Sequence, residues 1–319
     1  MPRLSRRDFV AHSASCATHL ALAAAVLPPT WRRRWVATPR RPVVAQAPFG
    51  RLERVADGIW ALISTPLTGD RTTLANGGIV AGRAGVLAVE GFYQPEGAAW
   101  LAAQARALTG RWPTHVALTH YHADHTNGVG GYVTADVRPA LRATTVTRDL
   151  ALDRNQPNDE RRAALAAVAP LPTEPSVLDL GDRVVRLVPR DGHTASDVSL
   201  EIDDPSVVFC GDLVWHGMFP NFVDAIPSRL TAAVRALRRT RDTAYVPGHG
   251  PLGGGGEFDQ YVAVLSEVEG AARQAHGEGL DAAAAAERFA LPPSLGEWVL
   301  FGRTFYERAF AAWYRELTG

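Results

Sequence analysis

Lysine is absent from this sequence, so all 33 of its Lys and Arg positions are arginines. Cysteine is scarce as well, with Cys16 and Cys210 as the two thiols. Cys16 lies in an N-terminal segment that we expect to be removed, so the mature chain would keep one thiol and form no internal disulfide. The rest of the composition is ordinary. Apolar residues make up 46% and charged residues 21% of the 319 positions, which is typical of a globular protein with a substantial core.

Positive charge is also scarce once the N-terminus is set aside. The first 47 residues contain eight arginines and a single acidic residue, Asp8. The remaining residues contain 25 arginines against 32 acidic residues, a balance of about −7. A nucleic-acid-binding protein needs a basic face, so this balance argues against a nucleic-acid partner.

The N-terminal segment has the pattern of an export signal. "SRRDFV" at 5–10 pairs Arg6 with Arg7, and an apolar stretch then runs through "LALAAAVL" to Leu27. The paired arginines resemble a twin-arginine (Tat) signal peptide, which is read by the twin-arginine export machinery. The resemblance implies a periplasmic or exported protein. The alternative is a membrane anchor, but the apolar stretch is shorter than the roughly 20 residues that a spanning helix needs, so we expect no stable membrane insertion after cleavage.

Residues 28–47 connect this signal to the rest of the chain. They are rich in proline and arginine, and we expect a disordered basic linker, so that 1–47 is signal and linker together. The cleavage site stays open. "AQA" at 45–47 has the small-x-small form but lies far beyond the apolar stretch.

From residue 52 to about 255 the pattern predicts one α/β domain. Short apolar runs bounded by Gly, Asn and Asp predict strands at 58–64, 77–82, 85–91, 114–120, 183–190, 197–203, 206–212 and 243–250. Residues 140–152 indicate a strand that runs into a helix, and further helices are expected at 95–110, within 155–175 and at 227–240. Four glycines at 253–256 predict a flexible break. The spacing of apolar residues in 256–319 then predicts a helical C-terminal extension.

One short stretch concentrates the residues that carry chemistry. "THYHADHTNG", residues 119–128, places three of the ten histidines and an aspartate within six positions, directly after the apolar "VAL". His193 follows "RLVP", Asp212 ends "VFCGD" and His249 follows "TAYV" in the same way. Four sequence-distant strands thus each deliver a nitrogen or carboxylate at their C-terminal end, where a rigid sheet can hold a site.

These residue types predict a metal site. His120 and His122 share one face of an extended segment and can hold one ion, while Asp124 and His125 follow as the chain turns toward a second point. Imidazole and carboxylate together suit zinc, with iron and manganese as alternatives. Five histidines and two aspartates are too many for one tetrahedral ion and fit two ions that share a carboxylate. A lone histidine is more often a core residue than a ligand, but that reading does not fit seven such residues placed after apolar runs.

The motif His-x-His-x-Asp-His at 120–125, followed by His193, Asp212 and His249, resembles that of the metallo-β-lactamase superfamily in order and spacing. The resemblance extends over about 58–255. It implies an αβ/βα metallo-β-lactamase sandwich of two mixed β-sheets flanked by helices, with the metals at one edge. We therefore expect a metallo-β-lactamase-like hydrolase domain over 52–255.

The resemblance also implies a role for each residue. The first metal would be held by His120, His122 and His193. The second would be held by Asp124, His125 and His249. Asp212 would bridge the two, and Glu90 in "LAVEG" occupies the position where the family usually has an aspartate that supports the ligands from behind.

The reaction that the resemblance implies is hydrolysis of an ester, thioester, lactone or amide in a small-molecule substrate. Two divalent ions lower the pKa of a bridging water toward neutrality, and the resulting hydroxide attacks a carbonyl that one ion polarises. Asp124 would orient the nucleophile and help pass a proton to the leaving group.

The residue at position 212 indicates the subgroup. True zinc β-lactamases typically carry cysteine or serine there, so Asp212 makes the chain more similar to glyoxalase II-like hydrolases. Several of these enzymes hold a substrate carboxylate with lysine, which this chain lacks, so an arginine would have to substitute.

Other functions stay open at this point. Persulfide dioxygenases share the implied fold and a similar histidine motif but use one iron, which makes a mononuclear iron sulfur-oxidising enzyme the main alternative. A binding protein that keeps the metals without turnover is a third hypothesis. The oligomeric state and the natural substrate are not indicated by the sequence.

Two regions near the motif give weaker predictions. "LVWHGMFPNF" at 213–222 is rich in aromatic residues, so Trp215, His216 and Phe219 are candidates for a substrate pocket. Core packing is as credible for Trp215 and Phe219, and exposure to solvent is more typical of a residue such as His216. Residues 155–175 could form a lid or an inert surface insertion.

Overall fold

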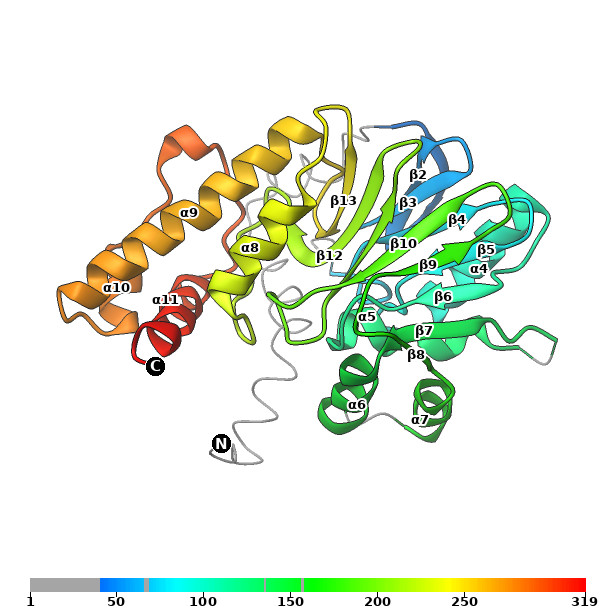
Figure 1. Ribbon diagram of the computed structural model, residues 1–319, viewed down its shortest axis with the longest axis horizontal. Coiled ribbons are helices and arrows are strands. Elements are labelled where there is room, and N and C mark those ends of the chain that lie inside the picture. The colour runs from blue at the N-terminus through cyan, green and yellow to red at the C-terminus, as the bar shows by residue number, and fades with distance from the viewer. Residues whose placement is uncertain (1–40, 66–68, 135, 156–157) are drawn as a thin grey trace.

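The computed structural model describes residues 41–65, 69–134, 136–155 and 158–319. The twin-arginine motif, the apolar stretch and most of the predicted linker lie outside the described residues. The described residues form two β-sheets packed face to face, with helices on the outer sides of both (Figure 1). The predicted αβ/βα sandwich is confirmed.

The larger sheet has eight strands that follow one another in chain order. β1 to β5 pair antiparallel and β5 to β8 pair parallel, so the sheet is mixed. Its strands are β1 (Val43–Ala47), β2 (Gly50–Ala56), β3 (Ile59–Ser64), β4 (Gly77–Ala81), β5 (Val86–Val89), β6 (His115–Ala117), β7 (Ala140–Thr144) and β8 (Ala169–Leu171).

Helices connect the parallel strands of this sheet, because a parallel pair needs a crossover connection. α4 joins β5 to β6, a short pair of helices joins β6 to β7, and two helices join β7 to β8. These elements are α4 (Pro95–Thr109), α5 (Ala123–Thr126), η2 (Val129–Tyr132), α6 (Thr145–Arg154) and α7 (Asp159–Ala166).

The smaller sheet has five strands in the order β13-β12-β11-β10-β9. The pairs are antiparallel except for β12 with β13, which are parallel and are joined by α8 (Pro227–Leu237). The strands are β9 (Ser176–Asp179), β10 (Val184–Pro189), β11 (Val198–Ile202), β12 (Val207–Trp215) and β13 (Ala244–His249).

Strand β3 illustrates how the sequence builds this sandwich. All six of its side chains are buried. Ile59 and Ile63 belong to the core between the two sheets, whereas Trp60 and Leu62 belong to the core between the larger sheet and α4. Alternate residues of a strand face opposite sides, so an unbroken apolar run fills both layers. Each large apolar side chain buried in this way contributes about 1.5–3 kcal/mol.

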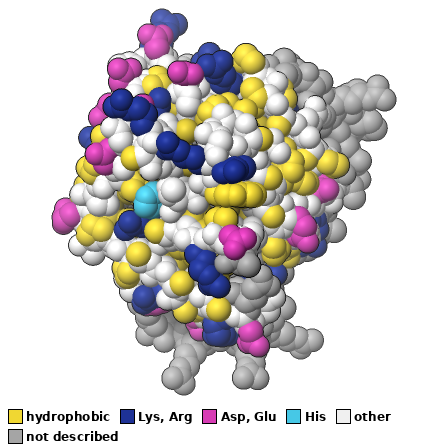
Figure 2. Space-filling view, turned by 90° about the vertical axis from the view of Figure 1, so that its right-hand side faces the viewer, with side chains coloured by type: hydrophobic (Ala, Val, Ile, Leu, Met, Phe, Trp, Pro, Cys, Tyr) yellow, Lys and Arg dark blue, Asp and Glu magenta, His cyan; other side chains and the backbone are white. Residues whose placement is uncertain are grey.

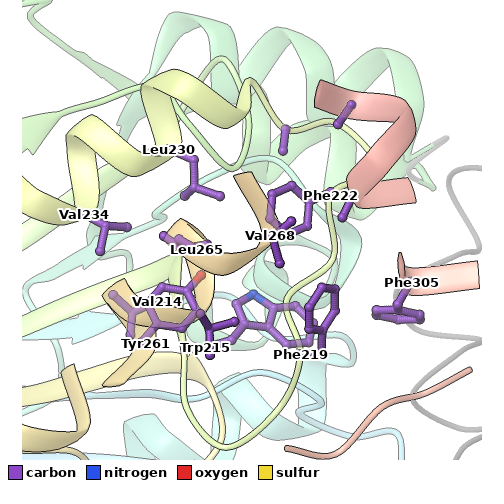
Figure 3. Packing of buried hydrophobic residues seen from close by; sticks show 14 of the residues in the cluster. Val214, Trp215, Phe219, Phe222, Leu230, Val234, Tyr261, Leu265, Val268 and Phe305 are labelled. Atoms are coloured by element: carbon purple, nitrogen blue, oxygen red, sulfur yellow. The ribbon is translucent and has the colours of Figure 1, made fainter. Parts of the chain in front are cut away.

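The C-terminal part of the chain is helical, as predicted. It forms α9 (Gly255–Gly277), α10 (Ala282–Arg288), η3 (Pro293–Leu295) and α11 (Thr304–Leu317). Figure 3 shows Trp215 of β12 beside Tyr261 and Leu265 of α9, with Phe305 of α11 at the edge of the same cluster. The C-terminal helices therefore share a core with the smaller sheet.

The predicted boundary at 47–52 is wrong. Residues 43–47, which we assigned to the disordered linker, form β1 and pair with β2, and β2 itself begins at Gly50. β1 could not be predicted from the sequence pattern for a physical reason. β1 is an edge strand whose valines are partly exposed, Val43 at 38%, so it lacks the alternation that marks a half-buried strand. The "AQA" stretch at 45–47 lies inside β1.

Three further local predictions need correction. β8 and β9 were not predicted, because strands of three or four residues are too short to show a period. β12 continues to Trp215, three residues past the predicted end. The predicted flexible break at 253–256 contains the start of α9, where the Glu257 side chain accepts a hydrogen bond from Gly254 N at 2.9 Å.

The surface and the helices give two further observations. Figure 2 shows arginine, acidic and apolar side chains intermixed over the described part of the face on the right of Figure 1. None of the helices in the described ranges combines the length and the apolar character that a bilayer-spanning segment requires.

Candidate metal centre

The seven predicted ligands come from four places in the fold. His120 and His122 follow the end of β6, and Asp124 and His125 lie in the short helix α5. His193 lies in the loop after β10, Asp212 lies within β12, and His249 ends β13. The structure brings all of them together in two adjoining groups.

The first group consists of three histidines. His122 Nδ1 is 3.0 Å from His120 Nε2 and 3.1 Å from His193 Nε2. With Asp212, these residues offer ligand atoms that all lie within 4.8 Å of one another. They form a compact cluster in which one imidazole nitrogen of each ring faces a common centre.

The second group consists of Asp124, His125 and His249, again with ligand atoms within 4.8 Å of one another. His249 Nε2 lies 3.3 Å from Asp124 Oδ2. Both histidines also face Asp212, whose Oδ1 is 3.2 Å from His125 Nε2 and 3.3 Å from His249 Nε2. The other oxygen of Asp212, Oδ2, is 3.3 Å from His193 Nε2 in the first group. The Asp212 carboxylate thus lies between the two groups with one oxygen toward each.

Several atoms at this centre are buried without a conventional partner. Both oxygens of Asp124, both oxygens of Asp212, and Nε2 of His125 and His249 make no hydrogen bond of acceptable geometry with any described residue. Burying a charged or polar group without a partner costs several kcal/mol. A divalent cation is the ligand that such imidazole and carboxylate donors would satisfy, so these residues fit a metal centre.

The pKa values of the ligands agree with this interpretation. Burial lowers the pKa of His193 to about 3, so this ring is neutral at pH 7 and can donate a lone pair. Burial would also lower the pKa of His249, but the Asp212 and Asp124 carboxylates outweigh it and raise that pKa to about 9. Burial raises the pKa of Asp212, yet the surrounding histidines hold it well below its usual range. The centre therefore contains ionised carboxylates whose charge a proton or a cation must balance.

Glu90, which was predicted to support the site, contacts His125 of the second group directly and is linked to His120 of the first group through Thr119. Its Oε1 is 3.0 Å from His125 Nδ1 and accepts a hydrogen bond from Thr119 Oγ1 at 2.6 Å. Thr119 Oγ1 is in turn 3.0 Å from His120 Nδ1. The Glu90 backbone has φ of +77°, an unfavourable conformation for a residue with a side chain, and such strain is typical of functional sites.

Two glycines that sequence reasoning did not single out shape the position of Asp212. Gly211 has φ of +52° and interrupts the pairing of β12 with β13, so the chain is bent just before the carboxylate. A Cβ at Gly211 would lie 2.7 Å from Thr119 Oγ1, and a Cβ at Gly248 would overlap Asp212 Oδ1. These glycines lie in the tripeptides "CGD" and "PGH", and nothing in the local sequence marks them as essential.

Asn76 is another residue that the sequence did not reveal. It is buried at the end of the loop between β3 and β4, and its Nδ2 donates to the carbonyl oxygens of Pro247 and Gly250 at 2.9 and 2.7 Å. Its backbone N donates to Gly248 O at 2.8 Å. Asn76 therefore ties the larger sheet to the end of β13, where His249 lies.

Asp224 is a further residue of this kind. Its Oδ2 is 3.0 Å from His122 Nε2 and accepts a hydrogen bond from Tyr121 Oη at 2.5 Å. Arg154 donates to Asp224 Oδ1 at 3.2 Å and to Tyr121 Oη at 2.6 Å. Asp224 is about 100 positions from His122 in the sequence, with no motif spacing between them, so no sequence signal could have found it.

The predicted pocket residues are buried rather than open to a substrate. Trp215 and Phe219 are exposed by 1% or less and belong to the core that β12 shares with the C-terminal helices (Figure 3). The Trp215 ring also packs 4.1 Å from the His249 ring, centroid to centroid. His216 was expected to face solvent if not a pocket, but it is buried, and its Nδ1 lies 2.8 Å from Pro251 O. β12 continues past Asp212 and carries Trp215 into this core, and the assignment of these residues to a substrate pocket stays a prediction.

Residues 155–175, for which the sequence left a lid and an inert surface insertion open, are partly built into the fold. Asn155 Nδ2 donates to Tyr121 O at 2.7 Å and to Thr126 Oγ1 at 3.0 Å, beside the metal ligands. Residues 169–171 form the edge strand β8 of the larger sheet. The described residues of this region therefore belong to the domain, through a strand of its larger sheet and through hydrogen bonds beside the metal ligands.

Comparison with known families agrees with the geometry. The family model described as "Metallo-beta-lactamase superfamily" matches residues 90–249, which is about half of the chain and includes all seven ligands and Glu90.

Two relatives in sequence are hydroxyacylglutathione hydrolases. The protein from Shewanella sp. (strain ANA-3) is 26% identical over 147 residues, which cover 46% of this chain and 50% of the relative. The protein from Rhodopseudomonas palustris (strain BisA53) is 28% identical over 140 residues, which cover 41% of this chain and 48% of the relative. The chain thus spans about half the length of the curated relatives it matches.

Solved structures with the same fold include two of different size. The sec-alkylsulfatase Pisa1 from Pseudomonas sp. matches with a TM-score of 0.70 at 15% identity, over 96% of this chain and 62% of that chain. A metallo-beta-lactamase from Pontibacter korlensis matches with a TM-score of 0.57 at 19% identity, over 67% of this chain and 98% of that chain. At such low identity these structural matches show likeness of fold alone. The family match adds the assignment: the chain belongs to the metallo-beta-lactamase superfamily.

Proposed function

We propose that the protein is a hydrolase that uses two divalent metal ions to cleave an ester, thioester, lactone or amide. Zinc is the metal we expect, with iron and manganese as alternatives. The observation that carries this proposal is the position of Asp212, which directs Oδ2 toward His193 and Oδ1 toward His125 and His249. A carboxylate placed between two groups of imidazoles can bridge a pair of ions.

The residues would divide the work as follows. His120, His122 and His193 would hold one ion, Asp124, His125 and His249 the other, and Asp212 both. When bound, the ions would activate a water molecule and polarise the C=O bond of the substrate, whose carbon atom that water attacks.

Asp124 has a further part in this proposal. Its Oδ2 faces His249, while its Oδ1 makes no hydrogen bond of acceptable geometry with a described residue and is available to accept a proton. We therefore assign to Asp124 the orientation of the nucleophile and the transfer of its proton toward the leaving group. Glu90 and Thr119 would keep the ligand rings in place while this happens.

The substrate class is the finer part of the proposal. The hydroxyacylglutathione hydrolases are named for a thioester substrate, so we rank thioesters and esters first. Because the chain has no lysine, an anionic group of the substrate would have to be held by arginine. Sulfate esters are a second candidate class, since the match to the alkylsulfatase covers 96% of the chain.

Metal analysis and a hydrolysis screen together test the proposal. The zinc-loaded protein is screened over thioesters, esters, lactones, β-lactams and sulfate esters, with Asp124→Ala as the inactive variant. Asp259→Ala is a matched control, because Asp259 pairs with Arg238 on the surface between α8 and α9. We expect turnover of a carbonyl substrate that is lost in Asp124→Ala and kept in Asp259→Ala. Activity that survives Asp124→Ala would refute the assigned role.

The same preparation separates the oxidoreductase alternative. An iron-dependent sulfur-oxidising enzyme would contain one iron per chain and consume oxygen with a persulfide substrate. Two ions per chain without oxygen uptake would support the hydrolase. One iron per chain with oxygen uptake would overturn it. Turnover of a sulfate ester alone would move the protein to the second candidate class.

Export through the twin-arginine route is part of the proposed function. It rests on Arg6 and Arg7 in "SRRDFV", and the small-molecule substrate would then be met outside the cytoplasm. Replacement of both arginines by lysine should abolish export, as measured by cell fractionation. Unchanged distribution of this variant would contradict the assignment.

A further inference from the structure

The two ring nitrogens of His122 face different groups, as those of His125 do. Nδ1 points toward His120 Nε2 and His193 Nε2, at 3.0 and 3.1 Å. Nε2 points away from the metal centre and lies 3.0 Å from Asp224 Oδ2. Asp224 lies in the loop between β12 and α8, outside the set of seven ligands.

This arrangement has a consequence for the tautomer of His122. A neutral imidazole carries its proton on one of its two nitrogens and offers a lone pair on the other. A carboxylate accepts an N–H hydrogen bond but is repelled by a lone pair, so Asp224 favours the tautomer with the proton on Nε2. In that tautomer the lone pair is on Nδ1 and points toward His120 and His193, where a cation would be bound.

We propose that Asp224 is a positioning residue that fixes the tautomer and ring orientation of His122 and thereby sets the affinity of the three-histidine metal site. The inference rests on the proposed function only in requiring that the centre binds divalent metal. It parallels the contact between Glu90 and His125, so a carboxylate outside the ligand set stands behind a histidine of each group.

Asp224 is itself held by two neighbours from other segments. Tyr121 Oη donates to Asp224 Oδ2 at 2.5 Å, and Arg154 at the end of α6 donates to Oδ1 at 3.2 Å. Arg154 also donates to Tyr121 Oη at 2.6 Å, and its guanidinium lies 5.2 Å from the centroid of the Tyr121 ring. Both oxygens of the Asp224 carboxylate therefore accept a hydrogen bond, which fixes the orientation of the carboxylate toward His122.

A purely structural ion pair between Asp224 and Arg154 is the competing explanation. The Arg154 side chain is 38% exposed and that of Asp224 29%, and an ion pair of this kind contributes little to stability. An ion pair with Arg154 alone also does not explain why Asp224 Oδ2 lies 3.0 Å from His122 Nε2. The two explanations differ in what the loss of Asp224 does to metal binding while the fold persists.

Zinc titration of the full chain distinguishes them. Metal-free wild type, Asp224→Ala, Asp224→Asn and Asp259→Ala are titrated with zinc against a chromophoric chelator, and circular dichroism verifies that each is folded. We expect two ions in the wild type and a loss of about 10–100-fold in the affinity for one of them in Asp224→Ala. Asp224→Asn should fall between, because its amide oxygen accepts the hydrogen bond without the charge. Asp259→Ala should behave as the wild type.

Cobalt substitution adds a readout that does not depend on activity. The visible absorption of bound cobalt reports ligand geometry, so Asp224→Ala should change the spectrum of one ion and leave that of the other. Wild-type affinity for both ions in a folded Asp224→Ala variant would overturn the inference, as would equal weakening of both ions in folded Asp224→Asn. A wild type that binds no metal would overturn it together with the proposed function. Selective weakening without any hydrolytic activity would leave the inference intact and refute only the hydrolase.

Discussion

Two buried carboxylates on neighbouring strands have opposite surroundings. Glu201 on β11 is within hydrogen-bonding distance of four donors at 2.6–2.8 Å, which are those of Arg186, Arg190, Ser199 and Arg239. Asp212 on β12 faces histidines, and neither of its oxygens makes a hydrogen bond of acceptable geometry with a described residue. Both side chains are almost fully buried.

This difference separates a structural charge from a functional one. Arginines that surround a buried carboxylate balance its charge permanently and leave no place for a ligand. Imidazoles around a carboxylate balance it only when they are protonated, and otherwise leave their lone pairs available for a cation. We therefore expect metal binding to depend on Asp212 and stability without metal to depend on Glu201.

The largest effect is expected from Asp212→Ala. The change removes the oxygen atoms that face both groups, so zinc affinity should fall by more than the roughly 100-fold that loss of a supporting contact causes. Hydrolytic activity should fall with it. Metal content after dialysis, measured by atomic emission, checks the prediction, and a variant that retains two ions would contradict the bridging role.

Gly248→Ala should have the next largest effect, although it removes no ligand. The added Cβ would overlap Asp212 Oδ1, so the carboxylate must move and zinc affinity should fall by about 10–100-fold. Gly270→Ala is the matched control, because a Cβ at this position in α9 meets no atom within 4 Å, and alanine favours a helix by about 1 kcal/mol. Equal zinc affinity in the two variants would show that the position of Asp212 does not matter.

Glu201→Gln should give the opposite result from the changes around Asp212. Loss of the charge leaves three neighbouring arginines with one carboxylate fewer, although Asp203 still pairs with Arg239 at 2.8 Å. The free energy of unfolding should therefore fall by about 1–3 kcal/mol. The number of bound zinc ions should stay the same. Urea unfolding of the metal-free protein provides the measurement, with Glu269→Gln as a control because Glu269 pairs with Arg273 on the surface of α9. A loss of zinc in Glu201→Gln would contradict the assignment of metal binding to Asp212 and of metal-free stability to Glu201.

The smallest effect concerns pH. Burial raises the pKa of Glu201, but hydrogen bonds from Arg190, Ser199, Arg186 and Arg239 outweigh it and lower the pKa to about 2. Because the pKa is lower in the folded state, the stabilising contribution of Glu201 is present above about pH 4.5 and is lost as the pH falls toward 2. Unfolding free energies of wild type and Glu201→Gln should therefore converge between these pH values. Parallel curves over this range would be the contrary result.

The ligand set was accessible from the sequence for a clear reason. Each ligand follows an apolar run that becomes a strand, and the ends of β6, β10 and β13 meet at one edge of the sandwich. Glu90 was accessible only through the resemblance to the superfamily, in which its position usually carries an aspartate. Most strands and helices between 58 and 250 followed from apolar periodicity in the same way, the short elements β8, β9, α5 and η2 excepted.

Other parts depend on contacts that no local pattern encodes. Asp224 and Asn76 reach the centre across about 100 and 170 residues, through side chains that are common in loops. For the aromatic residues after Asp212 the sequence left core packing and a substrate pocket open, because composition does not show where a strand ends; β12 extends to Trp215 and places it in the core. Short edge strands such as β1 and β8 are formed by pairing with a neighbour rather than by their own apolar period.

The number of divalent ions that each chain binds tests the central claim most directly. Zinc-reconstituted wild type and Glu201→Gln should each retain two ions per chain after dialysis, and Asp212→Ala should retain fewer. A wild type with a single iron or no metal, or an Asp212→Ala variant with two ions, would contradict the account of a carboxylate placed between two histidine groups to bridge a pair of cations.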